Sequence, residues 1–181
     1  MKVILGSASP RRRELLAEIT PSFDIRVSHA DEHCTLPDPV QRVMFTAGRK
    51  AQALSVGADE LIVCADTIVT CQGRVLGKPA DSAEATQMLT LLNHNVNSVY
   101  TGVCLRTTHS WDFFCARSDV RIDMTPQALA AYVATGSPLD KAGAYGIQDE
   151  LLSATLLSGS LSNVIGLPVE SLREHLAPFL G

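Results

Sequence analysis

The chain of 181 residues carries a formal net charge of −4, and 46% of its residues are hydrophobic. This length allows one domain with a sizeable core, and the composition excludes an intrinsically disordered chain. The negative charge argues against a protein that coats nucleic acid, but a small polyanionic ligand needs only a few well-placed cations. The apolar runs, such as Leu61–Ala65, are too short to cross a bilayer, and the N-terminus lacks the pattern of a secretory signal.

The cysteines indicate a reducing compartment. There are five of them, an odd number, and no Cys-x-x-Cys pair occurs, which argues against a disulfide framework or a structural zinc site. Cys64, Cys104 and Cys115 lie in strand-like runs, where a free thiol behaves as a small buried hydrophobic group. We therefore expect a cytoplasmic protein.

Strand and helix signals alternate at the start of the chain. Ser9-Pro10 and Asp38-Pro39 each combine an N-cap residue with a proline at the first helical position. The run from Leu61 is typical of a central strand covered on both faces. In chain order the patterns predict a strand over Lys2–Leu5, a helix from Pro10 to about Ile19, a strand over Phe23–Ser28, a helix from Pro39 to about Leu54 and a strand over Leu61–Ala65.

Hairpin and helix signals follow. Gln72-Gly73 is typical of a tight turn, and Asp81 with Glu84 forms an aspartate version of the capping box. The patterns predict a hairpin of Thr67–Thr70 and Arg74–Leu76, a helix over Ser82–Leu92, strands over Val96–Arg106 and Phe113–Ile122, a helix from Pro126 to about Thr135, loops over 137–162, and a last helix ending near Leu176. We expect a single α/β domain over residues 1–181, with a mixed twisted β-sheet flanked by helices and two lobes around a cleft.

The first candidate site is the segment Ser7–Arg13, at a strand-to-helix junction. A helix N-terminus presents free backbone N–H groups and the positive end of the helix dipole, which favour an anion. Two serines, Ser7 and Ser9, and up to three guanidiniums, among them Arg11 and Arg12, surround that end. Arginine binds phosphate oxygens in a bidentate fork. A solvated basic turn is the alternative, but the strand, serines and cap in register favour an anion site.

Two acidic segments are candidates for metal binding or catalysis. Asp31-Glu32 lies in a polar loop and can offer oxygen ligands to a hard cation, although in isolation an ordinary charged loop is the better interpretation of this pair. Asp66 ends the apolar strand, where a carboxylate is costly unless paired, hydrogen-bonded or metal-bound. It can deprotonate a water or bind Mg²⁺, or it can serve as a turn or cap residue.

In two further segments a lysine lies close to a residue that controls the backbone, a proline in one and glycines in the other. In Gly77-Lys78-Pro79 the proline fixes the backbone after the lysine, but the motif by itself also fits a surface turn. The segment from Asp140 to Gln148 contains Lys141 and two glycines, which allow close backbone approach to a ligand. Gln148 can both donate and accept, as reading a base edge requires. A loop this long favours function over a turn around a buried tyrosine.

Together these motifs resemble the Maf family. Each motif is short, but their order and spacing along nearly the whole chain are specific. The segments that carry the resemblance are Ser7-Ala8-Ser9-Pro10-Arg11-Arg12 with Glu14-Leu15-Leu16, Asp31-Glu32, Arg49-Lys50-Ala51, Ala65-Asp66-Thr67, Gly77-Lys78-Pro79, Tyr100-Thr101-Gly102, Asp140-Lys141-Ala142-Gly143-Ala144-Tyr145-Gly146-Ile147-Gln148 and Asn163-Val164-Ile165-Gly166-Leu167-Pro168.

The resemblance implies a house-cleaning enzyme that hydrolyses dTTP, UTP and related or modified pyrimidine nucleotides to the monophosphate and pyrophosphate. It implies Mg²⁺ or Mn²⁺ as cofactor, with Glu32 and Asp66 as metal ligands and Asp66 as the general base. The residues implied to bind substrate are Ser7, Ser9, Arg11, Arg12, Lys50, Thr67, Lys78, Lys141 and Gln148. Among them Arg12, Thr67 and Gln148 match positions associated with specificity for dTTP and UTP. A homodimer is also implied.

The chain departs from the family pattern at two positions. Arg49 stands where the family often has glutamate, and Asp149 follows Gln148 where the family often has glycine. An alternative function of another class is a nucleotide-binding regulator of cell division that acts through a protein partner. The carboxylates Glu32 and Asp66 favour turnover, because a pure binder has little use for acids facing a polyphosphate. We expect neither nucleic acid nor membrane as a partner.

Overall fold

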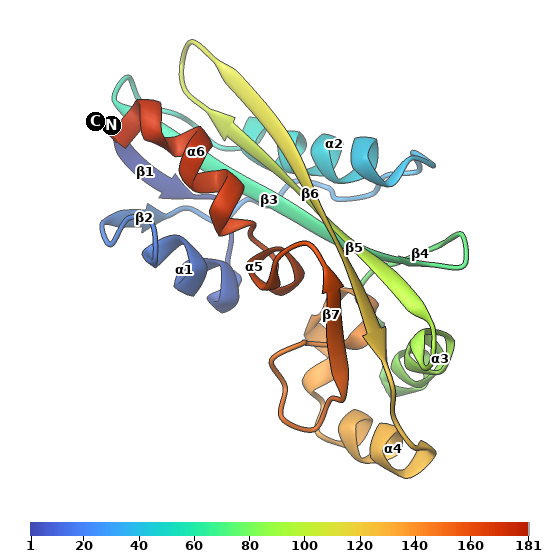
Figure 1. Ribbon diagram of the computed structural model, residues 1–181. Helices are drawn as coiled ribbons and strands as arrows, with labels where there is room; N and C mark the ends of the chain where they lie inside the picture. Colours follow the sequence, from blue (N-terminus) through green and yellow to red (C-terminus); the bar gives the residue numbers. More distant parts are fainter. Residues whose placement is uncertain (181) are drawn as a thin grey trace. The chain divides into compact units, whose positions relative to one another are not determined.

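A mixed β-sheet of seven strands organises residues 1–180, the part of the chain that the computed structural model describes (Figure 1). The strand order is β2-β1-β3-β5-β6-β7, with β4 paired to β3. The strands are β1 Lys2–Leu5, β2 Phe23–Ile25, β3 Glu60–Cys71, β4 Arg74–Leu76, β5 Val96–Arg106, β6 Trp111–Ile122 and β7 Ala154–Ser158. β1 is parallel to β2 and β3, whereas β4 and β7 pair antiparallel with β3 and β6. The expected mixed α/β sheet is therefore confirmed.

The helices begin where the sequence places cap residues. Ser9, Asp38, Asp81 and Thr125 each accept a hydrogen bond from a backbone N–H three residues later, which satisfies one orphan donor of the first turn. The helices are α1 Pro10–Ala17, α2 Pro39–Gln52, α3 Ser82–Leu92, α4 Pro126–Ala134, α5 Leu161–Ile165 and α6 Val169–Leu180, with 3-10 turns η1 Ser137–Asp140 and η2 Ala142–Ala144. In residues 1–180, no helix has the length and apolar character needed to span a membrane.

The chain divides into two compact units. Unit 1 comprises Met1–Asp66, Thr101–Ala116 and the segment from Gly166, and unit 2 comprises Thr67–Tyr100 and Arg117–Ile165. Strands β3, β5 and β6 contribute residues to both units. Unit 1 contains α1, α2 and α6, and unit 2 contains α3, α4, α5 and the two 3-10 turns.

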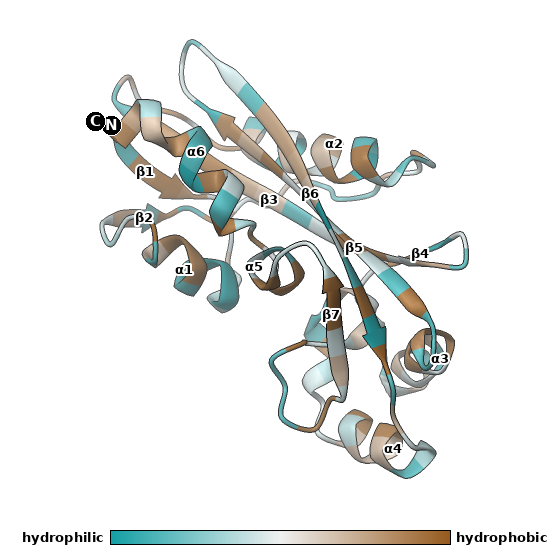
Figure 2. Ribbon diagram, viewed as in Figure 1, coloured by the Kyte–Doolittle hydropathy of each residue, from teal (hydrophilic) through white to brown (hydrophobic). Residues whose placement is uncertain are grey.

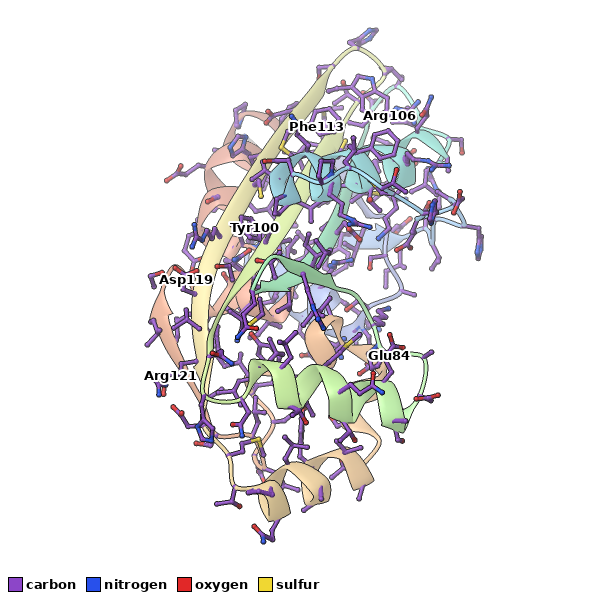
Figure 3. The ribbon with its side chains drawn as sticks, turned by 90° about the vertical axis from the view of Figure 1, so that its right-hand side faces the viewer. Glu84, Tyr100, Arg106, Phe113, Asp119 and Arg121 are labelled. Atoms are coloured by element: carbon purple, nitrogen blue, oxygen red, sulfur yellow. The ribbon has the colours of Figure 1, made fainter. Side chains whose placement is uncertain are left out.

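The core of unit 1 lies between α2 and the strands. Hydrophobic residues run along β1 and much of β3 (Figure 2). The buried cluster comprises Ile4, Ala47, Ala51, Leu54, Ile62, Cys64 and Cys104. Gly102 lets β5 approach α2, because a Cβ there would lie 2.6 Å from the Val43 carbonyl carbon. Arg106 (Figure 3) donates to the carbonyls of Ala51 and Leu54 near the end of α2, and its guanidinium carbon lies 4.7 Å from the centre of the Trp111 ring.

The core of unit 2 lies around α3 and α4. Leu89, Leu92, Val120, Ile122 and Tyr132 are among its fully buried side chains. The 3-10 turns pack on α3, with Glu84 near its N-terminus (Figure 3). The β3–β4 hairpin has the predicted turn, since Gln72 and Gly73 both adopt positive φ angles, of 49° and 75°.

The structure corrects several predicted boundaries. β3 does not end at Ala65 but continues through Asp66 to Cys71. β2 ends at Ile25 and α1 at Ala17, earlier than predicted, and α6 runs on to Leu180. The stretch 137–162 is not mainly loop, because it contains η1, η2, β7 and the start of α5. β7 was missed because it lies at the edge of the sheet with Leu157 exposed, so its hydrophobic alternation is weak.

Candidate active site

A lysine occupies the buried face of α2. Lys50 falls on the same helical stripe as the core residues of that helix, and its side chain is only 9% exposed. Its Nζ lies 2.9 Å from Asp66 Oδ1 and 3.0 Å from Glu32 Oε2, and it donates to the Ala65 carbonyl at 3.4 Å. Burying an ammonium is costly without such partners. Three motifs that are separate in the sequence, those of Glu32, Lys50 and Asp66, therefore meet at the Lys50 ammonium.

Asp66 lies within β3 rather than at its end, which corrects the sequence prediction. The strand continues because Thr67–Thr70 are rich in β-branched residues and pair, in part, with β4. The Asp66 side chain is 14% exposed and has Lys50 as its counter-ion. A carboxylate held in this way fits a reacting group or a metal ligand better than a turn or cap residue.

The loop before α2 presents Glu32 to Lys50. Asp31 Oδ1 accepts a hydrogen bond from the His33 backbone N–H at 2.9 Å, and Arg49 Nη2 lies 3.5 Å from Asp31 Oδ2. The His33 hydrogen bond, followed by the charge of Arg49, lowers the pKa of Asp31. Asp31 thus shapes the loop, and Glu32, with a side chain 58% exposed, is the member of the acidic pair that reaches the site.

The N-terminus of α1 has the predicted cap. Ser9 Oγ accepts from the Arg12 backbone N–H at 3.5 Å, and Ser7 Oγ accepts from the Ser9 N–H at 3.2 Å. The side chains of Ser7, Ser9, Arg11 and Arg12 are all half-buried. The two hydroxyls therefore stand at the first turn of α1, as an anion site at a helix N-terminus requires.

Arg12 is held from both sides of its guanidinium. Its Nε donates to the Gly166 carbonyl at 2.8 Å, and its Nη1 donates to Ser7 Oγ at 3.5 Å. Burial lowers the pKa of Arg12, and the nearby carboxylates Asp66 and Glu32 oppose this effect. An arginine nevertheless stays charged in proteins. Arg12 therefore belongs to the same electrostatic site as Lys50, Glu32 and Asp66.

Lys141, in unit 2, is almost buried between the two 3-10 turns. Its side chain is 10% exposed, and its Nζ donates to the Ser137 carbonyl at 2.6 Å, to Ser137 Oγ at 2.9 Å and to Asp140 Oδ1 at 2.8 Å. Asp149 Oδ2 lies 3.8 Å away. The ammonium is thus held in one place rather than extended into solvent.

The other predicted residues of unit 2 lie on three segments. Thr67 is half-buried on β3, whereas Lys78 and Gln148 are exposed. The segment of Lys78 is joined to η2, because the Gly143 N–H donates to the Gly77 carbonyl at 3.0 Å. Gly143 adopts a φ of 68°, and a Cβ there would lie 2.8 Å from Val69 Cγ2, so glycine is needed at this position.

Sequence reasoning did not assign two residues that support the predicted lysine and arginine. Ser137 contacts Lys141, and the Gly166 carbonyl contacts Arg12. Gly166 lies in the Asn163–Pro168 segment, which carried the resemblance to the family, so a signal for it was present. Ser137 had no such signal, because a serine after a helix is common in any loop.

Comparison with known proteins identifies the family. The family model described as "Maf-like protein" matches residues 2–179. The chain belongs to the Maf family. It is 46% identical to the "dTTP/UTP pyrophosphatase" of Moorella thermoacetica, over 98% of this chain and 95% of that protein. It is 41% identical to the protein of the same name from Bacillus cytotoxicus, over the same shares of the two chains.

Solved structures place the Maf chain in a wider fold. A HAM1 protein from Coxiella burnetii superposes with a TM-score of 0.53 at 14% identity, over 98% of this chain and 99% of that one. The Staphylococcus aureus Ham1 protein gives the same TM-score at 11% identity. At these identities the likeness shows a common fold alone.

The two departures from the Maf pattern both lie beside predicted site residues. Arg49 pairs with Asp31 and donates to the His33 carbonyl at 3.3 Å, so it holds the loop of Glu32. Asp149 accepts from Tyr132 Oη at 2.6 Å and from Ser137 Oγ at 2.8 Å, beside Lys141. Both side chains therefore fix the residues around them.

The donors for a metal ion are carboxylates. Within residues 1–180 there is no group of three or more His, Cys, Asp and Glu side chains that could hold a metal ion by itself. Glu32 and Asp66 meet at Lys50, and Mg²⁺ is typically bound through one or two carboxylates together with substrate phosphates. These two residues thus fit a hard divalent cation that arrives with a nucleotide.

Proposed function

We propose that this Maf protein hydrolyses nucleoside triphosphates, with dTTP and UTP as substrates, to the monophosphate and pyrophosphate. The observation that carries the proposal is the contact of Lys50 with both Asp66 and Glu32, within electrostatic reach of Arg12. Two relatives at 46% and 41% identity over nearly the full chain are named for this reaction. The proposal extends to related or modified pyrimidine nucleotides.

Asp66 is the proposed general base. The Lys50 ammonium fixes its carboxylate through Oδ1. Asp66 orients a water toward the α-phosphorus and takes its proton as the new P–O bond forms. Water attack breaks the bond between the α-phosphorus and the bridging oxygen, and pyrophosphate leaves. Since the reaction needs little covalent chemistry from the protein, positioning and charge neutralisation supply most of the rate.

Cations and a helix end hold the phosphates in this mechanism. Ser7, Ser9, Arg11 and Arg12 form the anion site at the start of α1, where the dipole and the hydroxyls favour phosphate oxygens. Lys50, Lys78 and Lys141 bind further phosphate oxygens. Glu32 and Asp66 would hold Mg²⁺ or Mn²⁺, and the bound cation would supply neutralisation of phosphate charge.

Three residues set the base preference in the proposal. Arg12, Thr67 and Gln148 match the positions linked to dTTP and UTP specificity. The exposed Gln148 amide can donate to and accept from a pyrimidine edge.

We infer a cytoplasmic location because all five cysteines are free thiols. We also propose that the protein forms a homodimer, which a measurement of its molecular mass in solution would test.

Pyrophosphate release from a panel of nucleoside triphosphates with Mg²⁺ or Mn²⁺ tests the function. The wild-type chain is expected to release pyrophosphate from dTTP and UTP in preference to GTP and 7-methyl-GTP. Asp66→Asn, which keeps the size of the side chain but loses the base, is expected to lower kcat by about a thousandfold. Asp24→Asn is the matched control, because Asp24 is an exposed acid of unit 1 that pairs with Lys2.

Two results would overturn the proposal. Full activity of Asp66→Asn would remove Asp66 as the base. Nucleotide binding without pyrophosphate release from any substrate would instead favour the nucleotide-binding regulator.

A further inference from the structure

Four side chains around the η1 turn form one continuous hydrogen-bond network. Tyr132 on α4 and Ser137 both donate to Asp149 Oδ2, at 2.6 Å and 2.8 Å. Ser137 Oγ in turn accepts from Lys141 Nζ at 2.9 Å. All four residues lie in unit 2. The network therefore joins the end of α4, the η1 turn and the segment after Gln148 within one unit.

The direction of each hydrogen bond follows from proton counting. A serine hydroxyl has one proton and two acceptor lone pairs. Since Ser137 gives its proton to Asp149, its oxygen faces Lys141 as an acceptor. Lys141 can only donate, so a Ser137 proton turned toward it would repel the ammonium. Asp149 thus sets the orientation of the Ser137 hydroxyl, so that a lone pair of its oxygen faces the Lys141 ammonium.

Tyr132 holds Asp149 in place. The residue is 1% exposed, and burial together with the Asp149 hydrogen bond raises the pKa of the phenol, which keeps it protonated and donating. The same oxygen accepts the Gly146 backbone N–H at 3.0 Å. The carboxylate is therefore fixed by a rigid core residue, in contrast to an acid on a free loop.

Lys141 is confined along its whole length. A Cβ at Gly146 would lie 2.7 Å from Lys141 Cε and 2.9 Å from Cδ, so the glycine leaves just enough room for the stem. Two of the ammonium contacts go to Ser137, and the third goes to Asp140, whose side chain is 61% exposed. The exposed Asp140 carboxylate is the partner that an incoming phosphate can replace at least cost.

We propose that Asp149 is a positioning residue, which acts through Ser137 to aim the Lys141 ammonium at a phosphate group of the substrate. This inference rests on the proposed role of Lys141 in binding phosphate. Asp149 itself makes no contact with the substrate in this proposal. Its carboxylate limits the conformations open to the Lys141 side chain before the substrate arrives. Substrate binding therefore costs less conformational entropy of that side chain.

A double-mutant cycle of Asp149→Ala and Lys141→Ala tests the proposal. The readouts are the KM and kcat for dTTP and the Kd of inorganic pyrophosphate, which needs no turnover. Each single variant is expected to raise KM and the pyrophosphate Kd about tenfold, as for loss of one charge-assisted contact, with kcat within about twofold. The double variant is expected to match Lys141→Ala alone, because Asp149 acts through the lysine.

Two further variants separate positioning from a purely structural role. Asp149→Asn keeps an oxygen that can accept from both hydroxyls, so its KM is expected to stay within about twofold of wild type. Glu150→Ala removes the exposed neighbouring acid and is expected to change neither constant. If Asp149 had only a structural role, Asp149→Ala would lower the melting temperature of both the wild-type chain and the Lys141→Ala variant. The KM of the single variant Asp149→Ala would then stay unchanged.

The outcomes distinguish this inference from the proposed function. Multiplicative effects of the two substitutions, or an unchanged KM in Asp149→Ala, would overturn the positioning role while leaving the enzyme intact. An unchanged KM and pyrophosphate Kd in Lys141→Ala would remove the phosphate role of the lysine, and with it the inference. Absence of turnover in the wild type would overturn the proposed function. The Kd of pyrophosphate would still measure the coupling between Asp149 and Lys141 in the double-mutant cycle.

Discussion

Lys50 Nζ lies 2.9 Å from Asp66 Oδ1, on a face of α2 that otherwise packs into the core. Two charges removed from water attract each other strongly, but each loses hydration. The net contribution of such a pair to folding is therefore small, whereas removal of one partner leaves a costly uncompensated charge. This asymmetry separates the contribution of the pair to stability from its contribution to catalysis.

The Lys50→Met substitution is expected to lower the free energy of unfolding by about 3 kcal/mol, because Asp66 and Glu32 lose their shared cation. The double variant Lys50→Met/Asp66→Asn is expected to recover most of that loss. Neither variant is expected to release pyrophosphate. Urea unfolding and the release assay measure the two effects. Lys2→Met, at an exposed pair with Asp24, serves as control. A double variant no more stable than the single one would contradict the account.

Arg49→Gln tests the loop that carries Glu32. The substitution removes the ion pair with Asp31 and the contact with the His33 carbonyl. We expect the Mg²⁺ concentration for half-maximal activity to rise about threefold to fivefold, which corresponds to loss of a partly exposed ion pair. The measurement is a Mg²⁺ titration of pyrophosphate release. Arg121→Gln, which removes a partly exposed ion pair with Asp123, is the matched control, and an equal shift in both variants would point to net charge instead.

Gly6→Ala tests the close packing between the end of β1 and β3. A Cβ at Gly6 would lie 2.2 Å from Cys64 Sγ and 3.0 Å from Leu54 Cδ1. Such overpacking is expected to cost about 2 kcal/mol of unfolding free energy. The double variant Gly6→Ala/Cys64→Ala removes the sulfur and is expected to restore part of the stability. Thermal and urea unfolding measure both, and a double variant with added losses would show that the clash lies elsewhere.

Glu60→Gln tests acid sensitivity of unit 1. Hydrogen bonds from Arg26 and then from the Gly57 N–H lower the pKa of Glu60 from 4.5 to about 2. A lowered pKa in the folded state means that this contribution to stability is present above pH 4.5 and is lost as the pH falls toward 2. We expect Glu60→Gln to show a shallower loss of stability across this range, measured by urea unfolding at each pH. Glu174→Gln, at an exposed position of α6, is expected to follow the wild-type curve.

Local signals predicted most of the elements and their starts. Cap residues followed by proline located α1 and α2, and Gln72-Gly73 located the β3–β4 turn, because these effects act within a few residues. The predicted end of β3 was wrong, because a charged residue such as Asp66 within a strand resembles a strand end until its ion-pair partner is known. Lys50 is that partner, and it comes from a different element.

The order and spacing of short motifs by themselves determined the family, and with it the residues to examine. The tertiary structure decided how those residues meet: Glu32 and Asp66 on one buried ammonium, Arg12 on the Gly166 carbonyl, and Asp149 behind Lys141. The physical reason is distance. Caps, turns and periodicity arise from interactions between near neighbours in the chain, whereas the cost of burying a charge is met only by partners that folding brings from elsewhere.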